Sequence, residues 1–208
     1  MLRRLFLGWM LFANQFALAA GTVKSAPVVI CLGDSLTEGY EISPDAAYPA
    51  LLEKKLKEKF GPGATVINAG ISGATSASGE ERLRFQLKAT QRPTHLILAL
   101  GANDGLRGLP VAAMHKNLEN TVKVARSSNM KVLLAGMKVP PNYGAAYTKS
   151  FDSTFKKLAR ELKIPLIPFL LEGVAARQDL NLPDGIHPNP AGHKIIVETV
   201  WKHLEPML

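Results

Sequence analysis

Five short, almost uninterrupted apolar segments recur along this chain, and they limit its folds more than any other feature. They span residues 28–32, 64–68, 94–100, 131–135 and 164–167. Strands in the middle layer of a parallel sheet are buried on both faces and have this composition, whereas half-exposed strands alternate apolar with polar residues. Longer segments with apolar residues at helical spacing separate them, at residues 48–60, 78–90, 110–128 and 145–162.

The strict alternation of these two patterns predicts an α/β fold. Pro190 suits the first turn of a last helix over residues 190–203, and Pro110 suits the start of an earlier one. Helices on both faces of a five-stranded parallel sheet form a three-layer α/β/α sandwich. With 208 residues and no internal repeat or linker, we expect a single domain over residues 20–208.

The first 19 residues have the features of a secretory signal peptide. Arg3 and Arg4 precede an apolar stretch at residues 5–18, and Ala17-Leu18-Ala19 is typical of a cleavage site. The alternative is a membrane anchor, but the stretch is shorter than the roughly 20 residues that a span needs. We therefore expect cleavage near Ala19 and a periplasmic or secreted protein.

The formal charge of +8 is spread over helical segments in which acidic and basic residues alternate. No basic strip carries aromatic residues that could stack on bases, so no nucleic-acid partner is expected. A weak attraction to anionic lipid or to an acidic substrate stays open. The single cysteine, Cys31, lies in the first apolar segment and is interpreted as a buried strand residue, so no internal disulfide can form.

Polar and glycine-containing segments follow the first three apolar segments directly. They read Gly33-Asp34-Ser35, Asn68-Ala69-Gly70 and Gly101-Ala102-Asn103-Asp104. Because the carboxyl ends of parallel strands meet at one edge of a sheet, we expect these segments to lie together. Asp184 and His187 precede the last expected helix, where the loop can fold back over that edge.

Ser35, His187 and Asp184 are the residue types of a nucleophile, a general base and an orienting carboxylate. A serine hydroxyl needs such partners to attack at neutral pH. The alternative for Ser35 alone is a helix N-cap. The other histidines are interpreted as surface or packing residues; they are His95, His115, His193 and His203.

An oxyanion also needs hydrogen-bond donors. The candidates are the N–H groups of Ser35 and Gly70 and the side-chain amide of Asn103, although Gly70 and Asn103 are also ordinary turn residues. Asp34 and Asp104 could be read as a metal pair, but no cluster of further ligands accompanies them. We therefore expect neither a metal nor a cofactor.

Taken together, these segments resemble the SGNH (GDSL) hydrolase superfamily. Its four blocks match Gly33-Asp34-Ser35-Leu36, Asn68-Ala69-Gly70, Gly101-Ala102-Asn103-Asp104 and Asp184-Gly185-Ile186-His187. The resemblance implies a flavodoxin-like α/β/α sandwich, Ser35 as nucleophile with Asp184 and His187, and an oxyanion hole from Ser35, Gly70 and Asn103.

Finer features are similar to the bacterial periplasmic branch, whose members are arylesterases, acyl-CoA thioesterases and lysophospholipases. The segments that carry this likeness are 33–40, 103–110 and 140–144. Two positions depart from the pattern: Ala74 stands where an acid is common and Ala102 where a second glycine is common. Neither is a catalytic position, so they bear on substrate range and loop flexibility.

We therefore expect a monomeric hydrolase of carboxylic esters with small to medium acyl chains, with thioesters as a further class left open. The resemblance and the apolar loops predict that the acyl chain contacts Leu106, Leu109, Ile186, Pro141 and Tyr143. Two alternatives remain. One is a glycan O-acetyl esterase, which the scarcity of aromatic sugar-stacking residues disfavours. The other is a non-catalytic α/β binding module.

Overall fold

A computed structural model describes residues 26–90 and 92–208 of the chain. The predicted signal peptide, residues 1–19, lies outside the described residues. Among the helices of these two stretches, none combines the length and the apolar character that a membrane span requires.

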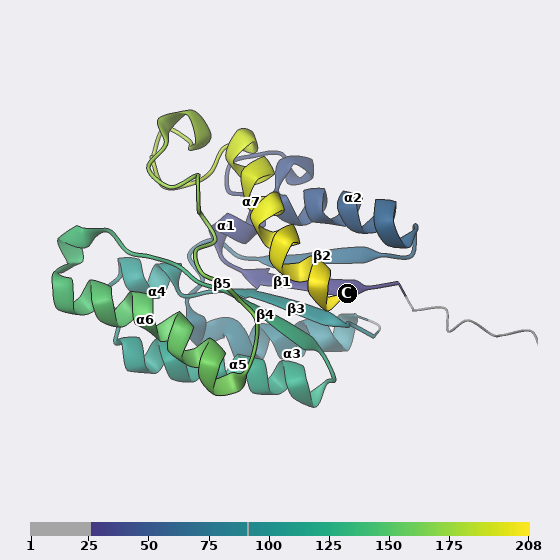
Figure 1. Ribbon diagram of the computed structural model, residues 1–208, viewed down its shortest axis with the longest axis horizontal. Helices are drawn as coiled ribbons and strands as arrows, with labels where there is room; N and C mark the ends of the chain where they lie inside the picture. The colour runs from purple at the N-terminus through teal and green to yellow at the C-terminus, as the bar shows by residue number, and fades with distance from the viewer. Residues whose placement is uncertain (1–25, 91) are drawn as a thin grey trace, which may run out of the picture.

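Five parallel strands form one sheet in the order β2-β1-β3-β4-β5 (Figure 1). Their bounds are β1 Val28–Gly33, β2 Thr65–Gly70, β3 His95–Ala99, β4 Lys131–Ala135 and β5 Leu166–Ile167. This order is the flavodoxin-like doubly wound arrangement, in which sites form where neighbouring connections diverge, between β1 and β3. The predicted parallel sheet is confirmed.

The last strand is shorter than predicted, with two residues instead of four. The N–H of Ile164 closes the end of the preceding helix by donating to the Ala159 carbonyl, and Pro165 has no N–H to offer. Pro165 contributes only its carbonyl, which accepts from the Leu134 N–H at 3.0 Å, and the strand itself is limited to Leu166 and Ile167, which pair with Leu134 and Ala135 of β4.

Helices cover both faces of the sheet, as predicted for a three-layer sandwich (Figure 1). One face carries α2 (Tyr48–Phe60) and α7 (Pro190–Leu204), and the other carries α3 (Gly79–Ala89), α5 (Val111–Ser127) and α6 (Ala145–Leu162). Pro110 lies directly before α5, at its N-cap, and not inside its first turn.

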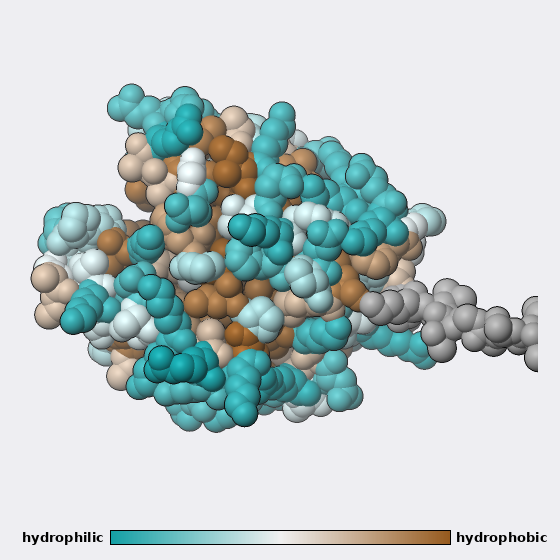
Figure 2. All heavy atoms as spheres, in the orientation of Figure 1, coloured by the Kyte–Doolittle hydropathy of each residue, from teal (hydrophilic) through white to brown (hydrophobic). Residues whose placement is uncertain are grey.

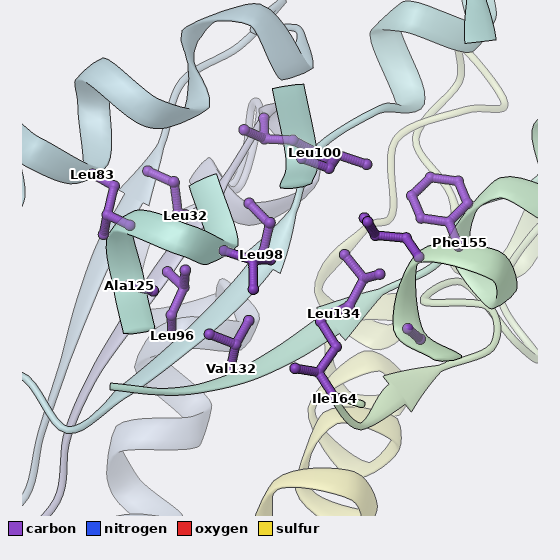
Figure 3. Close-up of a cluster of buried hydrophobic side chains, with 14 of the residues drawn as sticks. Leu32, Leu83, Leu96, Leu98, Leu100, Ala125, Val132, Leu134, Phe155 and Ile164 are labelled. Carbon is purple, nitrogen blue, oxygen red and sulfur yellow. The ribbon is translucent and has the colours of Figure 1, made fainter. Parts of the chain in front are cut away.

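Two buried clusters fill the space between the layers. Alternate residues of each strand point to opposite faces, so Leu32, Leu98 and Leu134 join the cluster under α3, α5 and α6 (Figure 3). Their neighbours Cys31 and Ile97 join the cluster under α2 and α7. This two-sided burial explains why the strands are uninterrupted apolar runs in the sequence.

Two short helices were not predicted, because one turn is too short to show periodicity. They are α1 (Ser35–Glu38), which follows β1, and α4 (Ala102–Leu106), which follows β3. Both lie at the carboxyl edge of the sheet. Single 3-10 turns complete the fold at Pro44–Ala46, Ser76–Ser78, Pro141–Tyr143, Gln178–Leu180 and Glu205–Met207.

Candidate active site

The sharp turn after β1 presents the Ser35 side chain at the sheet edge. Asp34 is the N-cap of α1, and its Oδ1 accepts a hydrogen bond from Leu36 N–H at 3.0 Å. Ser35 is therefore the first helical residue and not the cap. At this position the backbone N–H has no acceptor within the helix. Only glycine fits at residue 33, since a Cβ there would lie 1.9 Å from the Thr37 hydroxyl oxygen.

The loop before α7 brings His187 and Asp184 onto this serine. His187 Nε2 lies 3.0 Å from Ser35 Oγ, and His187 Nδ1 lies 2.6 Å from Asp184 Oδ2. The three predicted side chains thus form one continuous chain of hydrogen bonds, although Ser35 and His187 are 152 residues apart. In this geometry the ring can take the hydroxyl proton while the carboxylate holds the other ring nitrogen.

The Asp184 carboxylate is fixed by the backbone of its own loop. Its Oδ1 accepts hydrogen bonds from the N–H groups of Ile186 and His187, each at 3.0 Å. Partial burial raises the pKa of Asp184, but the hydrogen bonds from His187 and Ile186 outweigh burial and lower the pKa to about 2. The Asp184 carboxylate is therefore ionised at neutral pH.

Ser35 and His187 line a cavity of about 640 Å³. That volume is in the range of small-molecule sites. Its walls are mainly apolar and come from the loops around α4, the segment after β4 and the segment between β5 and α7; among them are Leu36, Leu106, Met137, Val139, Phe169, Leu171 and Ile186. Figure 2 shows a notch in the surface, on the side where the segment after β4 faces the segment between β5 and α7.

Asn103 lies in α4 and faces the same cavity. One of the two N–H groups of its side-chain amide donates to the Ala74 carbonyl at 3.0 Å. An amide nitrogen has two such hydrogens, so the second stays available to a bound ligand. The contact uses only the backbone of Ala74, so the unusual side chain at that position does not disturb it.

The structure does not place Gly70 at the cavity, where the sequence analysis expected its N–H to be an oxyanion-hole donor. Its N–H donates to Asn68 Oδ1 at 3.0 Å, and a Cβ at this residue would lie 2.1 Å from the backbone nitrogen of Glu38. Gly70 is thus needed for close packing against α1, and it is not part of the cavity wall.

Gly73, three residues later, does line the cavity beside Ser35 and Asn103. Its φ of +74° is a conformation that favours glycine. Glu38 accepts a hydrogen bond from Ser72 N–H at 2.7 Å, and Arg107 donates to the Gly73 carbonyl at 2.8 Å, so the turn is held on both sides. Among the described residues, no acceptor takes the N–H of Gly73.

Comparison with known proteins gives the family of this chain. Residues 31–195 match the GDSL-like lipase/acylhydrolase family. The chain belongs to this family. It is 39% identical over 184 residues to esterase TesA of Pseudomonas aeruginosa, covering 88% of this chain and 90% of that protein. It is 38% identical over 184 residues to thioesterase 1/protease 1/lysophospholipase L1 of Escherichia coli, covering 88% and 86%.

Two further relatives extend the comparison. An arylesterase of Vibrio mimicus is 38% identical over 189 residues, covering 91% of this chain and 93% of the relative. A crystal structure of TesA superposes with a TM-score of 0.82, covering 87% of this chain and 99% of that one at 39% identity. GDSL family membership makes the protein a carboxylic ester hydrolase, and the site above is the candidate for its active centre.

Three of the five residues predicted to contact the acyl chain line the cavity of this GDSL protein, and two do not. Leu106, Ile186 and Pro141 line the cavity, whereas Leu109 and Tyr143 do not. The Tyr143 hydroxyl instead donates to the Leu106 carbonyl at 2.7 Å. Its effect on the cavity is therefore indirect, because it fixes the end of α4, where Leu106 lies.

Several cavity residues were missed by the sequence analysis. The ring of Tyr40 packs on that of His187 with centroids 4.4 Å apart, and Phe169, Leu171 and Asn181 come from the segment between β5 and α7. This segment has no helical or strand periodicity. Tyr40 stands five residues after the nucleophile in a matched block, which was the available signal.

Arg82 of α3 holds the backbone that leads into the turn at Ser35. Its Nη2 donates to the carbonyls of Gly33 and Ala69, at the ends of β1 and β2. Burial raises the pKa of Asp34 to about 6, while the Leu36 N–H, His187 and the Arg82 charge act in the opposite direction. Asp34 Oδ2 is buried and has no hydrogen-bond partner among residues 26–90 and 92–208.

Asp34 and Asp104 serve separate structural contacts. The Asp104 carboxylate accepts hydrogen bonds from the backbone N–H of Ser76 at 2.7 Å and from its hydroxyl at 2.5 Å. Within residues 26–90 and 92–208, no group of three or more potential ligands could hold a metal ion. Cys31 is fully buried in β1, as predicted, and burial raises the pKa of its thiol to about 12.

Proposed function

We propose that Ser35 is the nucleophile of a two-step ester hydrolysis, with His187 as general base and Asp184 as its orienting carboxylate. The observation that carries this proposal is the unbroken chain of hydrogen bonds from Asp184 through His187 to Ser35 at the mouth of an apolar cavity. The roles follow from the general requirement of serine hydrolases.

The first step forms an acyl-enzyme. Ser35 Oγ attacks the substrate carbonyl carbon while its proton moves to His187 Nε2, and the imidazolium is held by ionised Asp184. The tetrahedral intermediate collapses, the bond to the leaving alcohol or thiol breaks, and His187 returns the proton to that group. In the second step His187 takes a proton from water, the hydroxide attacks the acyl carbon, and Ser35 is released with its proton restored.

The oxyanion hole is proposed to consist of the Ser35 N–H, the second amide hydrogen of Asn103 and the Gly73 N–H. Gly73 replaces Gly70 in this role because it lines the cavity and its N–H is free of other acceptors in the described part of the chain. Fixed donors of this kind stabilise negative charge where it appears in the transition state.

The substrate is proposed to be an ester with a small to medium acyl chain, with thioesters as a second class. Leu106, Val139 and Ile186 offer the acyl chain an apolar surface. The relatives named as esterase, arylesterase and thioesterase/lysophospholipase favour these substrates over acetylated glycans.

We also propose export to the periplasm, which the sequence of residues 1–19 supports. N-terminal sequencing of the protein from a periplasmic extract should find a chain that begins near residue 20. A full-length chain retained with the membrane would contradict the proposal and favour an anchor.

A weak contact of the cavity mouth with lipid surfaces is a further proposal, since Ile186, which lines the cavity, is 54% exposed. Ile71, which directly precedes the cavity residue Ser72, is 54% exposed as well. The protein is proposed to act as a monomer, because one chain supplies all members of the site. Vesicle co-sedimentation and light scattering test these two statements, and a stable dimer would contradict the second.

The test of substrate class is a hydrolysis series. Rates on p-nitrophenyl esters of graded chain length, acyl-CoA, lysophospholipid and acetylated glycan should be compared for the wild type, Ser35→Ala and the exposed control Ser153→Ala. We expect activity on the acyl esters, equal activity in Ser153→Ala and loss in Ser35→Ala. Turnover confined to the glycan would overturn the proposed substrate class.

A further inference from the structure

Gly73 lies in a tight turn over residues 71–74, here called the Gly73 turn. The Ala74 N–H donates to the Ile71 carbonyl at 3.1 Å, and the φ of Gly73 is +74°. This hydrogen bond, with a positive φ at the third residue, is the pattern of a type II turn, in which glycine is favoured at that position. The closing bond uses only the two outer residues, so it leaves the Gly73 N–H in the middle of the turn available to a ligand.

Packing holds only one end of the Gly73 turn. Ala74 packs against the buried cluster under α3, α5 and α6, but Ile71 is 54% exposed, and Ser72 and Gly73 are exposed as well. Exposed segments with few buried apolar contacts are the ones that open most easily. The position of the Gly73 N–H relative to Ser35 must therefore depend on polar contacts.

Glu38, the last residue of α1, holds one side of the turn. Its Oε2 accepts hydrogen bonds from the Ser72 backbone N–H, at 2.7 Å, and from the Ser72 hydroxyl. The Glu38 backbone is itself fixed, because its carbonyl accepts from the side-chain amide of Asn68 at 3.2 Å. Since α1 begins at Ser35, Glu38 connects the Gly73 turn to the helix that carries the nucleophile and its N–H.

Arg107, the C-cap of α4, holds the other side of the turn. Its Nη2 donates to the Gly73 carbonyl at 2.8 Å. Asn103 of the same helix donates to the Ala74 carbonyl at 3.0 Å. The turn is therefore in contact with both α1 and α4, the two helices that carry the other donors of the proposed oxyanion hole.

We propose that Glu38 and Arg107 are positioning residues of the oxyanion hole, which hold the Gly73 turn so that its N–H points to the same place as the other two donors. This deepens the proposed function and rests on it, because it requires Gly73 to be a donor. A donor stabilises the transition state only where the negative charge develops, and a misplacement of about 1 Å can cost roughly a hundredfold in rate. Both side chains lie outside the lining of the catalytic cavity, so they act through the turn and not on the substrate.

Steady-state kinetics on a p-nitrophenyl ester test this proposal, with kcat counted per active site titrated by a fluorophosphonate. Glu38→Ala and Arg107→Ala should each lower kcat about tenfold, and the double variant should approach the roughly hundredfold loss of a whole donor, with KM little changed. Glu38→Gln should keep the wild-type kcat, because both bonds from Ser72 end on a single oxygen, and an amide also offers one. Glu58→Ala/Arg84→Ala, at exposed residues of α2 and α3, is the matched control and should also keep it.

Two kinetic results would overturn the positioning role. An unchanged kcat in Glu38→Ala/Arg107→Ala would show that the donor stays in place without either contact. A kcat in Glu38→Gln as low as that in Glu38→Ala would show that the charge of Glu38 matters and that its hydrogen bonds to the turn do not.

The Gly73 amide signal in a proton–nitrogen correlation NMR spectrum separates this inference from the proposed function. In the wild type the amide proton should move downfield when a fluorophosphonate forms its adduct with Ser35, because the phosphonyl oxygen then accepts a hydrogen bond from it. In Glu38→Ala/Arg107→Ala the completed adduct should give a smaller shift. An equal shift in both proteins would overturn the positioning role and leave Gly73 as a donor. No shift in the wild type, with the adduct on Ser35 present, would instead remove Gly73 from the proposed oxyanion hole, and this inference with it.

Discussion

Protonation of His193 should limit the acid stability of this protein. His193 lies in α7 with 1% of its surface exposed, and its Nδ1 accepts a hydrogen bond from the Tyr48 N–H at 3.1 Å. Burial lowers the pKa of His193 from 6.5 to about 4. The unfolded chain therefore takes up this proton more readily than the folded one as the pH falls from 6.5 to 4.

The sign and size of the effect follow from that difference. The contribution to stability is complete above about pH 6.5 and is lost as the pH falls toward 4, because the folded state binds the proton last. At about 1.4 kcal/mol per pKa unit, the free energy of unfolding should decrease by about 3 kcal/mol across this window.

His193→Gln removes the titrating ring but keeps an oxygen that can accept from Tyr48. The free energy of unfolding should be measured by urea titration at pH 7.5 and 4.5 for the wild type, this variant and His203→Gln, a partly exposed histidine of the same helix. We expect the wild type and His203→Gln to lose about 2–3 kcal/mol more than His193→Gln on acidification. An equal loss in all three proteins would refute the reasoning.

Three further results are expected. Asn103→Ala should lower kcat roughly a hundredfold or more with KM little changed, measured per titrated active site, because an oxyanion donor acts mainly in the transition state; normal kcat with a lowered Tm would make Asn103 a turn residue only. EDTA should leave ester hydrolysis unchanged, and a loss of activity restored by one divalent ion would contradict this. Burial raises the pKa of Asp34 from 3.8 to about 6, so its contribution to stability is present at low pH and is lost as the pH rises through 6. When the pH rises from 5 to 8, the free energy of unfolding measured by urea titration should therefore decrease by about 1–2 kcal/mol less in Asp34→Asn than in the wild type. Equal decreases in the two proteins would argue against an ionising Asp34.

Long elements were predictable because each buried face repeats over several turns or residues. The bounds of α2 and α6 agree with the sequence prediction at both ends, since apolar spacing and flanking Gly61 and Gly144 mark them. The one-turn helices α1 and α4 were not predictable in this way. They exist because Asp34 and Gly101 allow the chain to turn sharply at the strand ends.

The catalytic constellation could be assembled from residue types and strand order, but the identity of the glycine donor could not. Gly70 ends β2 and Gly73 follows it by three residues, and only packing decides between them: Gly70 packs against the backbone of α1, while Gly73 lies in a turn at the cavity. Tyr143 was misplaced for a similar reason. Its hydroxyl is used to hold the Leu106 carbonyl, a contact between side chain and backbone that the sequence does not encode as a pattern.

The central claim is that Ser35 becomes a covalent nucleophile through His187. Treatment with a fluorophosphonate followed by intact-mass and peptide mass spectrometry tests it most directly. We expect one adduct per chain, located on Ser35, absent in Ser35→Ala and strongly slowed in His187→Ala, while Ser153→Ala labels like the wild type. Labelling of another residue, or an unchanged rate in His187→Ala, would contradict the account.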